Sequence, residues 1–207
     1  VKTYWMPGLI HEMAQDRNGT IWAGCSNEDI YALKKGASEF ERIVVFPRSF
    51  TFTSPVLRLS TGEIMIAAFS HGPRIIDPDT WEITEIDVSP MIKRSQFIPI
   101  CLYEDSYGDI WMGTIANGLI RYSRQSGKLE RMENTTCSDI SAVIEDGYGN
   151  IWVSTLFGMS RYDRSTGTFS SYFKNDGIGG NQFNERSSCA LEDGTIIFGG
   201  THGLTFF

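Results

Sequence analysis

The sequence lacks the features that mark several classes of protein. It contains no cluster of Lys and Arg, and Asp and Glu outnumber Lys and Arg by 25 to 18, which gives a net charge of −7. Because phosphate contacts need clustered cations, this balance excludes a general nucleic-acid binder. No apolar run approaches the roughly 20 residues that a membrane-spanning helix needs. Nothing like a signal segment follows Val1, so we expect an excised or processed piece.

Metal and cofactor motifs are also missing. The four cysteines lie far apart without CxxC spacing, which argues against a zinc site. We therefore predict no metal and no cofactor, and expect the cysteines to be free, buried and inert thiols that pack as small apolar side chains. They are Cys25, Cys101, Cys137 and Cys189.

The sequence has little material for catalysis. Only three histidines are present, and neither GxSxG nor HExxH occurs. Glycoside cleavage needs paired carboxylates, and Glu12, Glu28 and Glu185 are the only acids that we can place near one end of the predicted fold. We therefore expect no enzyme activity from this chain, with a glycosidase or lyase as the least favoured interpretation.

What the sequence does contain is one unit repeated five times. Its clearest copy, residues 140–173, has four short runs separated by turns rich in Gly, Asn and Ser. Runs this short between such turns indicate strands, so the unit is predicted to be a four-stranded antiparallel meander. The copies recur about every 40–45 residues, which is typical of a β-propeller blade. They align on Gly19, Gly62, Gly108, Gly149 and Gly194.

We therefore predict an all-β chain: a β-propeller of about five four-stranded antiparallel blades, in a single domain or fragment spanning residues 1–207. The last copy stops after its third strand, and residues 1–4 could add the fourth strand and close the ring. An open arc of a larger propeller is the alternative. Second strands should be buried on both faces and charged fourth strands exposed. The predicted blades cover residues 10–46, 55–88, 98–132, 139–173 and 184–207.

An acidic residue stands three positions before the aligned glycine in three copies, as Asp16, Asp105 and Asp146. These carboxylates could be metal ligands or acid–base groups. However, the same residue in several blades is spread around the fold rather than gathered at one site. We predict that each carboxylate accepts hydrogen bonds from the amides of its own turn and stabilises that hairpin.

The turns between second and third strands differ between copies, and in a blade they lie on the same face as the links between blades. Variable connections on a repeated scaffold often carry binding residues. Aromatic, amide, Arg and His side chains there would suit a polar ligand such as a sugar, or a carboxylate or sulfate on it. Ordinary solvated loops are the alternative. The candidate ligand-binding residues are Asn27, Glu28, Arg48, His71, Arg74, Arg94, Asn117, Phe157 and His202.

Three segments carry a resemblance to a known family. DRNGTIWAG, EDSYGDIWMGTIANGLIRY and EDGYGNIWVSTLFGMSRYDRSTGTF resemble the regulator-propeller repeats of hybrid two-component sensors. The resemblance implies a periplasmic propeller, followed in the whole protein by a membrane helix, a histidine kinase and often a response-regulator module. It also implies an oligosaccharide ligand, a homodimeric receptor, and control of polysaccharide-utilisation genes.

A sensor needs only a binding energy that differs between two states, so it can lack catalytic residues. A propeller scaffold for protein partners is the second interpretation, and it predicts a contiguous exposed apolar patch. The residues themselves leave both interpretations open.

Overall fold

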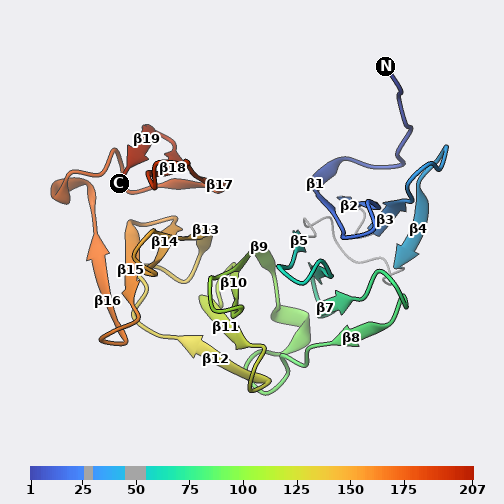
Figure 1. Ribbon diagram of the computed structural model, residues 1–207. Coiled ribbons are helices and arrows are strands. Elements are labelled where there is room, and N and C mark those ends of the chain that lie inside the picture. The colour runs from blue at the N-terminus through green and yellow to red at the C-terminus, as the bar shows by residue number, and fades with distance from the viewer. Residues whose placement is uncertain (26–29, 45–54) are drawn as a thin grey trace. The chain divides into compact units, whose positions relative to one another are not determined.

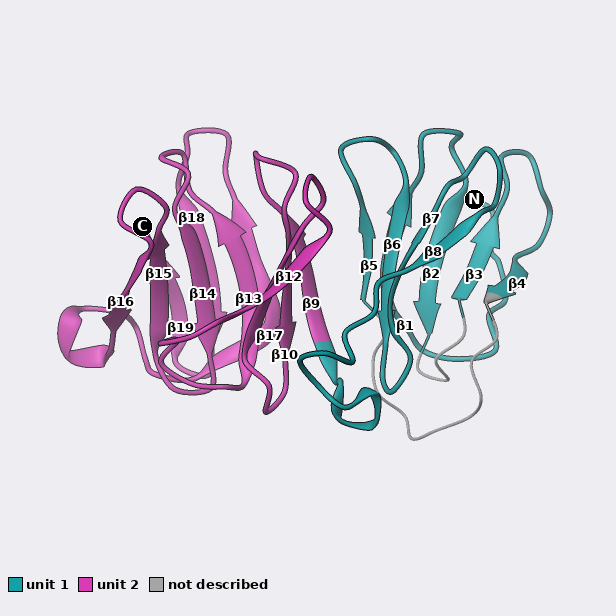
Figure 2. Cartoon of the chain, turned by 90° about the horizontal axis from the view of Figure 1, so that it is seen from below, with its two compact units in different colours: residues 1–99 teal, residues 100–207 magenta. Residues whose placement is uncertain are grey.

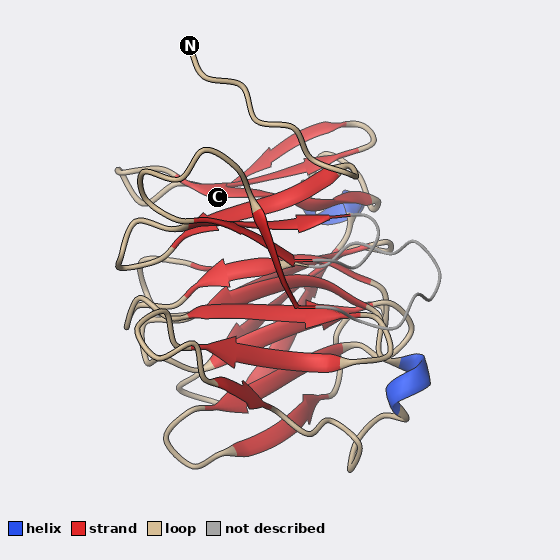
Figure 3. Cartoon of the chain, turned by 90° about the vertical axis from the view of Figure 1, so that its right-hand side faces the viewer, coloured by secondary structure: helices blue, strands red, loops and turns tan. Residues whose placement is uncertain are grey.

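The computed structural model describes residues 1–25, 30–44 and 55–207, and it confirms an all-β fold. Strands form nearly all of its regular structure (Figure 3). Two short 3₁₀ turns, η1 (Arg94–Gln96) and η2 (Lys174–Asp176), lie in links between sheets. The chain divides into two compact units, Val1–Pro99 and Ile100–Phe207, coloured separately in Figure 2.

The first unit contains two antiparallel meanders, each with its strands in chain order. The first blade consists of β1 (Ile10–Gln15), β2 (Ile21–Cys25), β3 (Ile30–Leu33) and β4 (Glu41–Val44). The second blade consists of β5 (Val56–Arg58), β6 (Ile64–Ala68), β7 (Gly72–Ile76) and β8 (Ile83–Glu85).

The second unit contains the other three meanders, labelled in Figure 1. The third blade consists of β9 (Pro99–Glu104), β10 (Ile110–Thr114), β11 (Leu119–Ser123) and β12 (Lys128–Met132). The fourth consists of β13 (Ile140–Glu145), β14 (Ile151–Thr155), β15 (Met159–Asp163) and β16 (Thr168–Tyr172). The fifth consists of β17 (Phe183–Ala190), β18 (Ile196–Gly200) and β19 (Gly203–Phe206).

These sheets are the propeller blades that the repeat predicts. The fifth sheet has three strands, β17-β18-β19. Residues 1–9 form no strand, so they do not add the fourth strand considered above. The ring of Tyr4 instead packs edge-on against Phe40 of the same unit, with 5.9 Å between ring centroids.

Burial across the second, third and fourth blades follows the predicted gradient. Every residue of β6, β10 and β14 is buried. The outer strands β8 and β16 are exposed or partly exposed along their whole length. The apolar second strands therefore form the core of each unit, and the polar fourth strands face solvent.

The recurring acid does more than hold its turn. In the third blade, Asp105 Oδ1 accepts hydrogen bonds from the backbone amides of Tyr107 (2.9 Å) and Asp109 (3.0 Å). Its Oδ2 accepts one from the indole Nε1 of Trp111, the second-strand tryptophan. Asp16 and Asp146 bind their own turn amides and the indoles of Trp22 and Trp152 in the same way, at 2.8 Å to the indole. The structural role predicted for these carboxylates is confirmed, and the indole bond is an addition to it.

The tryptophans held by these carboxylates pack against the following blade. The ring centroids of Trp22 and of Trp81 in the second blade are 5.3 Å apart, and those of Trp111 and of Tyr162 in the fourth blade are 5.6 Å apart. Trp152 lies 4.2 Å from Phe207, directly after β19. Trp22 and Trp111 are fully buried. One aspartate therefore ties a hairpin turn to the packing between two blades.

All four cysteines are free, as predicted, but only two are buried. Cys25 and Cys101 are buried in β2 and β9, whereas Cys137 is half-buried and Cys189 is exposed. The expectation that all four are buried is wrong for Cys137, which lies in a link, and for Cys189, which lies on the largely exposed β17.

We expect Asp105→Ala to lower the free energy of unfolding by about 3 kcal/mol, because it leaves the buried indole and two turn amides without an acceptor. It also removes the partner of the Arg164 guanidinium, which pairs with Asp105. Asp193→Ala is the control, since the exposed Asp193 holds the corresponding turn of the fifth blade, where Ile197 stands in place of tryptophan. Urea unfolding should show a clearly larger shift for Asp105→Ala; equal shifts would contradict the role of the indole bond.

Acid should destabilise the fourth blade through Asp146. Burial alone would raise the pKa of Asp146, but hydrogen bonds from Asn150, Trp152 and the turn amides outweigh it and lower the pKa. A lowered folded-state pKa adds stability above the unfolded value of about 4, and this is lost as pH falls through the folded pKa. Asp146→Asn should therefore show a smaller drop in urea midpoint than the wild type between about pH 5 and about pH 3. An equal drop in urea midpoint for the wild type and Asp146→Asn would contradict the role of Asp146 in acid destabilisation.

Candidate functional site

The turns between second and third strands lie beside the links between blades, as the sequence predicts. Each described turn donates a backbone hydrogen bond to a link of its own unit. The bonds are Ser70 N to Phe97 O (3.1 Å), Gly118 N to Ser138 O (2.9 Å), Gly158 N to Asn181 O (2.6 Å) and Thr201 N to Gln182 O (3.0 Å). The variable connections therefore form one face within each unit.

In the first unit, this face brings Arg74 and Arg94 to the same carboxylate. Arg94, in η1, forms an ion pair with Glu85 and lies 3.4 Å from Asp87. In β7, Arg74 Nη2 lies 3.7 Å from Glu85 Oε2. The hydrogen bond to Glu85 raises the pKa of Arg94 above its ordinary value. Both guanidinium groups thus face an acid of the chain itself, which reduces their attraction for an anionic ligand.

The remaining predicted residues of the first unit contribute less. His71 is half-buried, and its backbone amide donates to the Ala68 carbonyl at 3.2 Å, which places it in the turn itself. Asn27, Glu28 and Arg48 lie outside the described residues.

In the second unit, one aspartate joins two of the variable turns. Asp139 Oδ1 accepts a hydrogen bond from Ala116 N at 2.7 Å, and its carbonyl accepts one from Leu156 N at 3.1 Å. The side chain of Asn117 donates to the Ile115 carbonyl at 3.2 Å, so this predicted ligand residue stabilises its own turn.

Phe157 and His202 lie on the two sides of the next link, residues 173–182. Phe157 is 56% exposed and packs against Phe173, with 5.5 Å between ring centroids. His202 is exposed, and its Nδ1 lies 2.9 Å from Thr201 Oγ1. It lies close to Gly180, where an added Cβ would come within 3.3 Å of the His202 side chain. Asn117, Phe157 and His202 therefore share this face of the second unit.

A cavity of about 500 Å³ opens beside Phe157. Asn181 Oδ1 accepts a hydrogen bond from Lys174 N at 2.6 Å, and Asp176 Oδ2 accepts one from Phe173 N at 2.8 Å, so the polar groups are held in place. The site thus combines aromatic rings with an ammonium, a carboxylate and amides. Its lining residues are Phe157, Phe173, Lys174, Asn175, Asp176 and Asn181.

Of the six lining residues, only Phe157 is a predicted ligand-binding residue. The predicted fourth blade ends at Phe173, and the prediction gives no role to Lys174, Asn175 or Asp176. The structure ends β16 at Tyr172, and η2 then turns these residues toward Phe157. The signal that could have found them is the polar run Lys-Asn-Asp directly after an aromatic pair, in a link that must carry the chain to the next blade.

Across the described residues, no group of three or more His, Cys, Asp or Glu side chains is placed to hold a metal ion.

We expect Gly158→Ala to disturb this cavity. Gly158 has φ of +87°, and an added Cβ would come within 2.8 Å of both the Phe173 ring and the Tyr172 carbonyl. Gly118→Ala is the matched control: this glycine of the equivalent turn has φ of +74° and no atom within 4 Å of an added Cβ. Backbone strain should lower the free energy of unfolding of both variants. Overpacking should lower that of Gly158→Ala by about a further 1–3 kcal/mol. Equal urea midpoints for the two variants would contradict the tight contact.

A family model described as two component regulator propeller matches residues 93–116. No curated protein matches the chain in sequence. Among the described residues, no helix has the length and apolar character to cross a bilayer.

Solved structures share the fold over nearly the whole chain. The extracellular domain of a hybrid two component system from B. thetaiotaomicron is 24% identical, with a TM-score of 0.75 over 96% of this chain and 27% of that chain. A second such domain from the same organism is 18% identical, with a TM-score of 0.79 over 97% of this chain and 27% of that chain. Virginiamycin B lyase from Staphylococcus aureus is 13% identical, with a TM-score of 0.72 over 98% of this chain and 71% of that chain. The chain thus spans about a quarter of the length of the two sensor domains.

Proposed function

We propose that this chain, which carries a two component regulator propeller repeat at residues 93–116, is part of the ligand-sensing region of a hybrid two component sensor. It binds a carbohydrate fragment outside the cytoplasm, in the periplasm, and this binding regulates polysaccharide-utilisation genes. The whole protein would be a homodimeric receptor with a histidine kinase. The likeness to extracellular sensor domains supports the fold and the setting.

The observation that carries this proposal is the cavity beside Phe157. Ligand sites are usually concave, with apolar or aromatic walls and a few oriented polar groups. Here two phenyl rings in contact, tilted by 52° to each other, supply apolar surface, while Asn181 and Asp176 are oriented by hydrogen bonds to the link. Rings suit the C–H faces of a sugar, and amide and carboxylate groups suit its hydroxyls.

The position of the cavity also suits a sensor. It lies between a variable turn and the link to the next blade, which are joined by the 2.6 Å bond from Gly158 N to Asn181 O. A ligand that contacts both elements can favour one arrangement of the turn and link over another. Such a difference in binding energy between two states is all that signalling requires.

We expect calorimetric screening against neutral oligosaccharides to find one that binds saturably and is not converted. Phe157→Ala should weaken that binding about tenfold, because it removes one ring of the cavity wall. Leu156→Ala is the control, since this neighbouring side chain is 45% exposed but does not line the cavity.

Two outcomes would overturn the proposal. Conversion of an oligosaccharide to product would favour an enzyme, a role that the shared fold of virginiamycin B lyase shows to be possible for propellers. Equal affinity in the wild type and Phe157→Ala would remove this cavity as the binding site.

A further inference from the structure

The repeat supplies an internal comparison between two arginines at equivalent positions. Arg121 is paired across strands with Trp111 in the third blade, and Arg161 is paired with Trp152 in the fourth. The guanidinium carbons lie at nearly the same distance from the indole centroids, 5.7 Å and 5.9 Å. The two side chains therefore occupy the same place in their blades.

Their electrostatic surroundings differ. Arg121 Nε donates to Asp109 Oδ2 at 2.8 Å, and its Nη1 lies 4.0 Å from Glu130 Oε2 of the neighbouring strand. Asn150 stands at the position equivalent to Asp109, two residues before the tryptophan. Ser170 stands opposite Arg161, where Glu130 stands opposite Arg121. Both carboxylates of the third blade are thus replaced by uncharged side chains in the fourth.

Arg161 has neither of these partners, although it interacts electrostatically with the carboxylate of Asp163, two residues further on. Its Nε is buried and has no hydrogen-bond partner. The amide of Asn150 carries no charge, and its Nδ2 donates to Asp146 Oδ2 at 2.9 Å. A buried donor without an acceptor costs free energy, and Arg161 lacks the acceptor that Asp109 supplies to Arg121.

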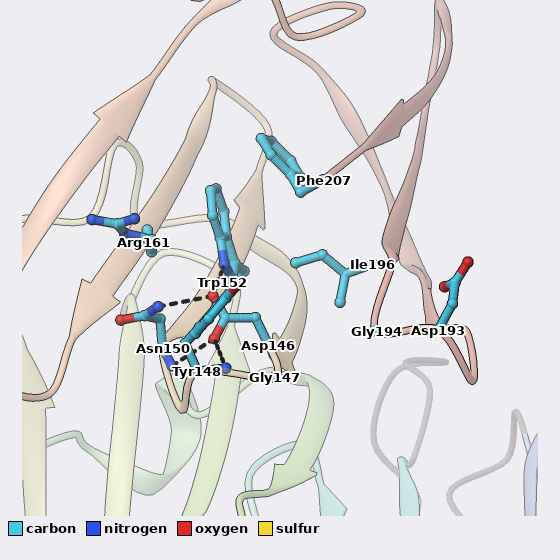
Figure 4. A pocket seen from close by; sticks show the side chains of 10 residues that line it. All are labelled: Asp146, Gly147, Tyr148, Asn150, Trp152, Arg161, Asp193, Gly194, Ile196 and Phe207. Carbon is cyan, nitrogen blue, oxygen red and sulfur yellow. Dashed lines mark hydrogen bonds between the residues drawn. The ribbon is translucent and has the colours of Figure 1, made fainter.

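A cavity of about 500 Å³ lies beside Arg161, between the fourth and fifth blades of the second unit (Figure 4). It is at the hairpin end of these blades, where the first strand turns into the second. Tyr148 offers a ring that is 94% exposed, and Trp152 and Phe207 add apolar surface. In Figure 4, Asp193 and Ile196 come from the sheet that faces Trp152. This cavity shares no lining residue with the one beside Phe157.

We propose that this second cavity binds an acidic sugar unit, whose carboxylate or sulfate accepts hydrogen bonds from Arg161. The carboxylate of Asp193 lies on the rim, where it can accept hydrogen bonds from sugar hydroxyls, and Tyr148 offers a face for the sugar ring. Guanidinium groups bind such anions through charge-assisted hydrogen bonds. The choice of a sugar as the carrier of the anion rests on the proposed function; the anion site itself rests on the comparison with Arg121.

The site can be tested by calorimetry on the whole chain at low salt. The probes are trigalacturonate, a sulfated chondroitin disaccharide, neutral galactotriose and inorganic sulfate. We expect one of the two acidic sugars to bind, with affinity that falls as NaCl is raised, and to bind at least tenfold more tightly than inorganic sulfate. Arg161→Gln should weaken that binding about tenfold or more.

A matched pair of variants at Ser170 tests the role of the positive charge of Arg161 without removing Arg161 itself. Ser170→Glu restores the carboxylate that faces the arginine in the third blade, on an exposed position of β16. It should therefore compete with the acidic sugar and weaken its binding several-fold. Ser170→Gln has nearly the same size but no charge, and it should bind like the wild type. Far-UV circular dichroism confirms that each variant is folded.

The results separate this inference from the proposed function. Binding of an acidic sugar that depends on Arg161 supports the second cavity even if galactotriose and other neutral sugars fail to bind beside Phe157. Four results would overturn the inference: neither acidic sugar binds, inorganic sulfate binds as tightly as the sugars, Arg161→Gln binds like the wild type, or Ser170→Glu and Ser170→Gln bind equally well.

Discussion

The hydrogen bond between a buried aspartate and the indole of a second-strand tryptophan supports much of this structure. The carboxylate of Asp105 organises the amides of a hairpin turn with one oxygen and holds Trp111 with the other. The same ring then packs against Tyr162 of the next blade. Local turn geometry and packing between blades therefore depend on one side chain, and the arrangement recurs at Asp16 and Asp146.

Because this shared frame depends on the aspartate, the tryptophan and the apolar strand pattern, other positions in the same strands and hairpin turns are free to differ. Asn150 and Ser170 have lost the carboxylates that Asp109 and Glu130 supply in the preceding blade, and the fold remains the same. The residue changes act on the charge around Arg161 rather than on the meander itself. Differences between repeats of one chain can thus indicate a binding site where a single blade would look ordinary.

The links have a second role besides joining the blades. Asp139 joins two variable turns, and the link at residues 173–182 contacts a turn on each side through Asn181 and Gln182. A ligand held by such a link contacts elements of two blades at once. The fold alone does not decide between sensing and catalysis, since a lyase shares it.

Local sequence patterns were enough to predict the all-β class, the repeated blades and the structural role of the aspartates. These features depend on local patterns: short apolar runs, turn residues and a constant period. Packing in the folded chain established that Glu85 pairs with both Arg74 and Arg94, and that Phe173 lines a cavity with Phe157. It also decided that residues 1–4 form no strand. Such contacts depend on the path of each link and on the register of neighbouring strands, and both arise from packing between residues that are distant in the sequence.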